Sequence, residues 1–139
     1  MKHKVLFLCT GNSCRSQMSE AIVNARLQSE WQAFSAGTRP EGYVHPMALQ
    51  ALEEIGIHHD GRSKSAEEFQ DAEFDAVVTL CDSALNECPV WLGKGRRLHR
   101  SFSDPLEAQG TEEEKMQAYR TVRDQIAREI PELLRQLKS

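Results

Sequence analysis

The sequence predicts a single α/β domain of three layers, in which a four-stranded parallel sheet is flanked by helices. Short apolar runs alternate along the chain with segments whose apolar residues recur every three or four positions. This alternation is typical of parallel strands joined by right-handed helical crossovers, which cover both faces of the sheet. A length of 139 residues allows one well-filled core and is too short for two. We therefore expect residues 1–139 to form one domain.

The first predicted strand contains the continuous apolar run Val5-Leu6-Phe7-Leu8, which is followed at once by a glycine-bearing turn. A strand that is buried on both faces of a parallel sheet has this pattern. Two further apolar runs and one weaker segment follow along the chain. The four predicted strands are residues 3–8, 31–35, 74–80 and a segment near 97–99.

The predicted helices lie between these strands and after the last one. Helical spacing of apolar residues begins after Ser16 and lasts about three turns. A second helix is expected to start at Pro46 and end near Gly56, because proline suits the first helical position and glycine suits the end. The polar residues 58–73 predict a turn and a short acidic surface helix, and residues 82–87 are compatible with another helix.

The last predicted helix begins after Thr111. Thr111 and Glu114 have the spacing of a capping box, in which each residue bonds the backbone N–H of the other. An apolar stripe continues from Met116 to Leu137, and Pro131 within it is a candidate for a kink.

The composition excludes several classes of partner. The formal net charge is −4 and the pI is about 5.7, so we expect no binding to nucleic acid or to an anionic membrane surface. No apolar run approaches the roughly 18 residues that span a bilayer, and the N-terminus lacks the pattern of a signal peptide, so a cytoplasmic location is expected. In that reducing compartment, four cysteines indicate catalytic, redox, metal-binding or buried thiols rather than a disulfide framework.

The residues that follow the first strand predict an oxyanion site. Cys9 ends the strand, and five residues separate it from Arg15, which opens a helix. Such a loop lets successive backbone N–H groups converge on one point, while the arginine offers two further donors to the same anion. The partial positive charge of the helix N-terminus favours an anion and pushes a nearby thiol toward thiolate. The predicted oxyanion-binding residues are Thr10, Gly11, Asn12, Ser13, Cys14, Arg15 and Ser16.

Individual residues of this loop have predicted roles. Cys9 is the candidate nucleophile, and the Ser16 hydroxyl is placed to donate to its sulfur. Lowering a thiol pKa by two units requires about 2.7 kcal/mol of differential stabilisation, which dipole, hydroxyl and guanidinium together can supply. Asn12 is expected to adopt a left-handed conformation or to brace the loop. Cys14 is interpreted as a packing residue beneath the anion, with a reserve thiol as the alternative. The alternative for the whole loop is a buried strand-end cysteine and a surface arginine.

Two further cysteines, Cys81 and Cys88, form a candidate redox pair. In an intact helix their separation of seven residues would place them about 10 Å apart, whereas a disulfide needs Cα atoms within about 7 Å. A disulfide between them therefore requires the segment to unwind, which suggests a switch; two unrelated thiols are the alternative. Neither the cysteine spacings nor the pair His58-His59 fits a zinc site, so no metal is expected.

Three motifs resemble the low-molecular-weight protein tyrosine phosphatase family over most of the chain. They are residues 9–18 (CTGNSCRSQM), Ser35-Ala36-Gly37 and Asp104-Pro105. In the phosphatases of this family, the resemblance implies a phosphocysteine intermediate on Cys9 and Asp104 as general acid. The family also contains thioredoxin-coupled arsenate reductases, whose two additional cysteines resemble Cys81 and Cys88. Gln17 replaces a common phosphatase proline, and Leu106 replaces a frequent tyrosine, which also favours the reductases.

The resemblance implies a mechanism for arsenate reduction. Cys9 attacks arsenate that is held by the loop and Arg15, and Asp104 protonates the departing oxygen. Cys81 then attacks Cys9, arsenite leaves, and Cys88 attacks Cys81 to free Cys9. Reduced thioredoxin supplies the electrons, so no bound cofactor is expected, and phosphate or sulfate would compete with arsenate. We also expect a monomer. Glutaredoxin or mycothiol remains open as the electron source.

Some reductases of the family bind potassium near the loop through an acid on the first helix and other oxygen ligands. Glu20 and Ser35 match that pattern, but Lys64 lies near the later acidic position and is expected to replace the cation. A phosphatase remains the main alternative function, because arsenate and phosphate are nearly isosteric. An oxyanion-binding or redox-sensing module without catalytic turnover is the third.

Overall fold

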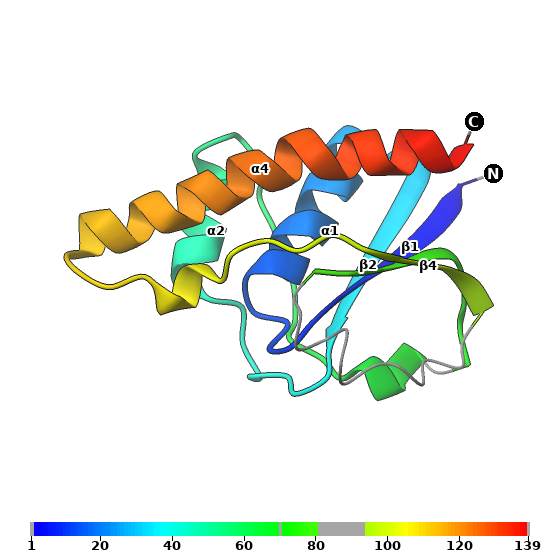
Figure 1. Cartoon of the computed structure of the whole chain (residues 1–139), viewed down its shortest axis with the longest axis horizontal. Coiled ribbons are helices and arrows are strands. Elements are labelled where there is room, and N and C mark those ends of the chain that lie inside the picture. Colours follow the sequence, from blue (N-terminus) through cyan, green and yellow to red (C-terminus); the bar gives the residue numbers. More distant parts are fainter. Residues whose placement is uncertain (1, 70, 81–93, 139) are drawn as a thin grey trace.

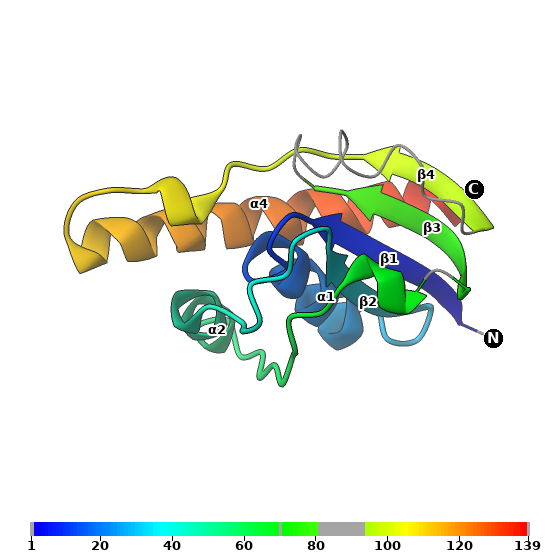
Figure 2. The ribbon, with the colours of Figure 1, turned by 90° about the horizontal axis from the view of Figure 1, so that it is seen from below.

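A computed structural model of the chain describes residues 2–69, 71–80 and 94–138. Its centre is a four-stranded sheet in the order β2-β1-β3-β4, and every neighbouring pair is parallel (Figures 1 and 2). The strands are β1 (His3–Cys9), β2 (Trp31–Gly37), β3 (Glu73–Thr79) and β4 (Lys94–His99). The predicted α/β class with a four-stranded parallel sheet is confirmed.

The buried residues of β1 alternate between two cores on opposite faces of the sheet. Val5 and Phe7 belong to the larger cluster, which includes residues of all the described α-helices. Leu6 and Leu8 belong to a smaller cluster on the other face. Because side chains of a strand point alternately to the two faces, burial on both requires a continuous apolar run, as observed.

Helices cover the larger core, and a short turn packs on the smaller one. The helical elements described are α1 (Arg15–Arg26), α2 (Pro46–Glu53), α4 (Glu112–Lys138) and the 3-10 turns η1 (Ala66–Phe69) and η2 (Pro105–Glu107). The long helix α4 packs against both α1 and α2 (Figure 1). On the opposite face, η1 contributes Ala66 and Phe69 to the smaller cluster (Figure 2).

Most predicted helix starts are confirmed. Pro46 opens α2, and His45 caps it by accepting a hydrogen bond at Nδ1 from the Met47 N–H at 3.1 Å. The capping box is present before α4: Glu114 N–H donates to Thr111 Oγ1 at 3.1 Å, and Thr111 N–H donates to Glu114 Oε1 at 3.2 Å. The helix α4 continues through Pro131 as one element.

Several boundaries differ from the predictions, most of them by one to three residues. The strand β2 extends to Gly37 rather than residue 35, and α2 ends at Glu53, three residues before Gly56. The short acidic helix expected within 58–73 is present as the single turn η1, and Ser63 and Lys64 before it bond to the loop after β1. The helix predicted at 82–87 lies outside the described residues.

The sheet brings the ends of β1, β2 and β3 to one edge. Cys9 pairs with Gly37, and the N–H of Leu80, just beyond β3, donates to the Leu8 carbonyl at 2.9 Å. A Cβ at Gly37 would lie 2.6 Å from the Thr10 carbonyl oxygen, so the close approach of these two segments requires glycine. Ligands of parallel α/β sheets bind at such carboxyl edges. None of the described helices has the length and apolar character of a membrane span.

Candidate active site

The loop between Cys9 and α1 turns its carbonyl groups away from its own centre. Donors from outside the loop occupy the carbonyl oxygens of residues 9–13: Thr38, Arg39, Glu41 and His45 through their N–H groups, Ser63 through its hydroxyl and Gln17 through its side-chain amide. Because the N–H and C=O of one planar peptide point in opposite directions, the N–H groups that follow these carbonyls face inward. The backbone therefore forms the converging set of donors that an anion requires.

A pocket of about 100 Å³ opens at this loop. Its lining includes the predicted nucleophile Cys9 and the predicted general acid Asp104. All predicted oxyanion-binding residues except Ser16 also line it: Thr10, Gly11, Asn12, Ser13, Cys14 and Arg15. A space this small selects a compact ligand or the compact end of a larger one.

Arg15 crosses from α1 to the segment before η2. Its Nη1 donates to the Phe102 carbonyl at 3.0 Å, and its Nη2 lies 3.5 Å from Asp104 Oδ2. Its buried Nε has no hydrogen-bond partner among the described residues. A buried donor without a partner is costly, and an anion in the adjacent pocket would supply the missing acceptor.

Asp104 is anchored by the turn that follows it. Its Oδ1 accepts a hydrogen bond from the Leu106 N–H at 3.0 Å, while its Oδ2 faces Arg15. The side chain keeps 27% of its surface exposed at the pocket. Asp104 thus lines the pocket with one oxygen held by Leu106 and the other beside Arg15, a position that makes it a candidate general acid.

Cys14 belongs to the core beneath the loop as well as to the pocket wall. Its Sγ donates to Tyr119 Oη at 3.6 Å, and burial raises the pKa of the thiol to about 11. The thiol is therefore protonated at neutral pH. This placement agrees with the packing role predicted for Cys14 and leaves Cys9 as the candidate nucleophile of the loop.

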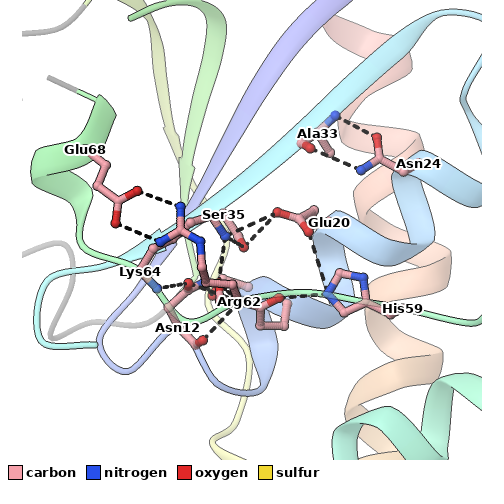
Figure 3. Close-up of polar contacts among 11 residues, drawn as sticks. Asn12, Glu20, Asn24, Ala33, Ser35, His59, Arg62, Lys64 and Glu68 are labelled. Carbon is pink, nitrogen blue, oxygen red and sulfur yellow. Dashed lines mark hydrogen bonds and ion pairs between the residues drawn. The ribbon is translucent and has the colours of Figure 1, made fainter. Parts of the chain in front are cut away.

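Asn12 shapes the loop from below, as predicted. It has a φ of 49°, the only positive φ of a non-glycine residue in the described parts of the chain. Its Nδ2 donates to Ser16 Oγ at 2.7 Å. Its Oδ1 accepts from the Lys64 N–H at 2.9 Å, and Figure 3 shows Asn12 and Lys64 side by side. Ser16 is fully buried and does not line the pocket, so its contribution is bracing through Asn12; its hydrogen bond to the Cys9 sulfur stays a prediction.

The ammonium group of Lys64 lies between the two side chains that the resemblance assigns to potassium. Its Nζ is 3.7 Å from Glu20 Oε1 and 3.4 Å from Ser35 Oγ (Figure 3). It also donates to the Arg62 carbonyl at 2.9 Å, and burial lowers its pKa. This is the geometry expected if Lys64 supplies the positive charge itself. Among the described residues, no group of three or more His, Cys, Asp or Glu side chains could hold a metal ion.

Sequence reasoning missed Glu41 as a wall of the pocket. Its N–H bonds the Gly11 carbonyl at 2.9 Å, and a Cβ at Gly11 would lie 2.9 Å from Glu41 Cγ. The sequence held one indication of this role: Glu41 follows the second predicted strand, which ends at the same edge of the sheet as Cys9. Leu106, noted only as a departure from the phosphatase pattern, also lines the pocket.

We expect the substitution Glu41→Gln to strengthen binding of inorganic phosphate about two- to fivefold at low salt. A carboxylate on the wall repels a dianion, and removing its charge relieves a Coulomb cost that is modest at an exposed position. Calorimetric titration at two ionic strengths would measure the gain, which should shrink as salt rises. Glu112→Gln, which removes the same charge at an exposed position outside the pocket, is the control. Unchanged or weaker binding in Glu41→Gln would contradict the prediction.

Cys81 and Cys88 lie outside the described residues, so their predicted pairing is not tested. Leu80, which precedes Cys81, is hydrogen-bonded to Leu8, which precedes Cys9. Leu80 therefore lies beside the end of the strand that carries Cys9.

The chain is similar to known proteins over nearly its whole length. A family model for low molecular weight phosphotyrosine protein phosphatases matches residues 4–139. A protein of Halalkalibacterium halodurans named arsenate reductase is 43% identical over 130 residues, which cover 93% of each chain. A solved arsenate reductase in its phosphate-binding state has a TM-score of 0.78 at 29% identity and covers 99% of both chains. The low molecular weight protein tyrosine phosphatase of T. tengcongensis has a TM-score of 0.81 at 25% identity, with 97% of this chain and 99% of that one covered.

The match to the family model extends over nearly the whole chain and includes the segment from Cys9 to Arg15 and Asp104. The chain belongs to the low molecular weight phosphotyrosine protein phosphatase family.

Proposed function

We propose that this protein is an arsenate reductase that acts in arsenic detoxification. The observation that carries the proposal is the pocket in which Cys9, the anion-binding loop, Arg15 and Asp104 meet. The curated relative at 43% identity, named arsenate reductase, supports arsenate as the oxyanion. The solved neighbour in a phosphate-binding state supports a tetrahedral oxyanion as ligand, with phosphate or sulfate as competitors.

The first step forms a bond between sulfur and arsenic. The Cys9 thiolate attacks arsenate, while the inward N–H groups and Arg15 hold the remaining oxygens. Asp104 donates a proton to the departing oxygen, which leaves as water. Because Arg15 contacts both the Phe102 carbonyl and the Asp104 carboxyl, its guanidinium and the Asp104 acid keep fixed positions relative to the bound anion.

The second step transfers two electrons. The Cys81 thiolate attacks Cys9 Sγ, the sulfur–arsenic bond breaks, and its electron pair reduces arsenic from the pentavalent to the trivalent state. Arsenite leaves and a Cys9–Cys81 disulfide remains. The Cys88 thiolate then attacks Cys81 and releases the Cys9 thiolate. The dithiol of reduced thioredoxin reduces the Cys81–Cys88 disulfide, so the proposal requires no bound cofactor and assigns the reaction to the cytoplasm, with a monomer as the working unit.

A low molecular weight phosphatase is the second candidate. The same pocket suits a phosphocysteine intermediate on Cys9, with Asp104 protonating the leaving group. The fold similarity to the T. tengcongensis tyrosine phosphatase favours this candidate. The two functions differ in their need for Cys81 and Cys88, because hydrolysis uses water where reduction uses a second thiol.

One pair of assays separates the candidates. NADPH oxidation would be followed with arsenate, thioredoxin and thioredoxin reductase, beside hydrolysis of para-nitrophenyl phosphate. Arsenate-dependent oxidation that disappears in Cys81→Ser would support the reductase. Efficient hydrolysis that Cys81→Ser leaves unchanged, without NADPH loss, would support the phosphatase. If the protein shows neither activity, the oxyanion-binding or redox-sensing module is the remaining hypothesis. Phosphate affinity of Cys81→Ser, measured by calorimetry, controls for an intact pocket.

A further inference from the structure

The side-chain amide of Gln17, on the first turn of α1, is held in one orientation. Its Nε2 lies 3.1 Å from the Asn12 carbonyl, 3.0 Å from Asn12 Oδ1 and 2.9 Å from the Arg62 carbonyl. All three partners are acceptors, so the amide nitrogen must face them and the amide oxygen must point the other way. Gln17 is fully buried, and its two amide hydrogens are both directed to these groups.

The amide oxygen of Gln17 faces His59. The distance between Gln17 Oε1 and His59 Nε2 is 2.7 Å, and 9% of the His59 side chain is exposed. Because Oε1 only accepts, His59 must carry a proton on Nε2. The carboxylate of Glu20 lies 3.6 Å from the same nitrogen, and the Lys64 ammonium lies 3.7 Å from that carboxylate (Figure 3). Both neighbours of His59 Nε2 are thus acceptors, which agrees with a proton on this nitrogen.

Gly61 provides the space for this contact. A Cβ at position 61 would lie 2.1 Å from His59 Nε2 and 2.2 Å from Gln17 Oε1, well inside van der Waals contact. The φ of Gly61 does not lie in the left-handed region, unlike that of Gly56, so an alanine there is compatible with the backbone. The three atoms nearest to such a Cβ all belong to His59 and Gln17, so a larger residue here would disturb their contact.

We propose that His59 is a positioning residue for the oxyanion pocket. It orients the Gln17 amide, which in turn bonds both the carbonyl and the side chain of Asn12 and holds the left-handed turn of the loop. Asparagine tolerates this conformation better than most residues but does not prefer it, so external bonds decide how fully it is populated. The inference rests on the proposed function only in that the pocket binds an oxyanion, and it holds for either candidate reaction.

Three variants separate the hydrogen bond from the shape of the side chain. His59→Phe keeps a ring and removes the donor, and His59→Gln keeps a donor near the position of Nε2. Gly61→Ala inserts a methyl group between the ring and the Gln17 amide and so breaks their contact from outside. The matched control is His58→Phe, because His58 is 72% exposed and bonds Glu53 and Asp60 instead of the loop. Two readouts apply to each reduced protein: the Kd for inorganic phosphate by calorimetry, and amide hydrogen exchange of residues 10–17 without ligand.

We expect His59→Phe and Gly61→Ala to raise the phosphate Kd about five- to tenfold, the size of one net hydrogen bond, and to speed exchange in the loop. His59→Gln should recover most of the affinity, and His58→Phe should match the wild type. In a double-mutant cycle, His59→Phe should add little to Gln17→Met, because both remove the same relay.

The proposal is wrong if His59→Phe and Gly61→Ala both bind phosphate within twofold of the wild type and exchange at its rate. It is equally wrong if His59→Gln is as weak as His59→Phe, or if the effects of His59→Phe and Gln17→Met add fully. Should His59→Phe fail to fold, Gly61→Ala and His59→Gln still decide the question. If the wild type binds no phosphate, the proposed function fails, whereas the exchange rates of the loop still test the relay.

Discussion

Arg15→Lys is expected to lower kcat/KM for arsenate by about 10²- to 10³-fold. Arginine presents several donors in a rigid fork, and here Arg15 uses them on Phe102 and Asp104 while its buried Nε remains for an anion. Lysine keeps the charge but supplies one compact ammonium group, which cannot bond all three partners. In other enzymes, removing one oriented donor to a developing anion lowers the rate by about 10²- to 10³-fold.

The measurement is the thioredoxin-coupled assay over a range of arsenate concentrations, with phosphate affinity determined in parallel. Arg120→Lys is the matched control, because Arg120 lies on α4 and pairs with Glu54 and Glu113 rather than with the pocket. A value of kcat/KM for Arg15→Lys within threefold of the wild type would show that charge alone suffices and that the fork has no role.

Cys88→Ser is expected to release one equivalent of arsenite per chain and then stop. The variant retains Cys9 and Cys81, so the sulfur–arsenic bond can form and be broken by Cys81. Without the third thiol, however, Cys9 remains in the disulfide and the pocket has no nucleophile. Rapid-quench measurement of arsenite would give the stoichiometry, and peptide mapping under non-reducing conditions should find Cys9 linked to Cys81.

The wild type treated with arsenate in the absence of thioredoxin is the control for that experiment. It should also release one equivalent, but its disulfide should join Cys81 and Cys88, and added thioredoxin should restart it. Sustained turnover of Cys88→Ser with thioredoxin would exclude the three-thiol order. So would a wild type that, like the variant, stops with Cys9 linked to Cys81.

The elements that could be predicted from the sequence are those set by neighbouring residues. The apolar run before Cys9 forms a buried strand, Pro46 suits the first position of a helix, and the Thr111–Glu114 pair caps the helix beside it. Such signals act within a few residues, and the structure confirms them. The short acidic helix predicted within 58–73 is present as the 3-10 turn η1, but no local pattern indicated that Ser63 and Lys64 before it bond the loop at Gly11 and Asn12.

Within the site, the sequence alone determined the loop from Cys9 to Arg15, because an anion-binding turn is built from consecutive peptide groups. What the loop contacts was decided by tertiary structure. Asp104 meets Arg15, and His59 meets Gln17, only because the folded chain brings together residues that are 89 and 42 positions apart. No local pattern specifies such pairs, since their hydrogen bonds depend on sheet register and on how the segments after β2 and β4 pack against α1.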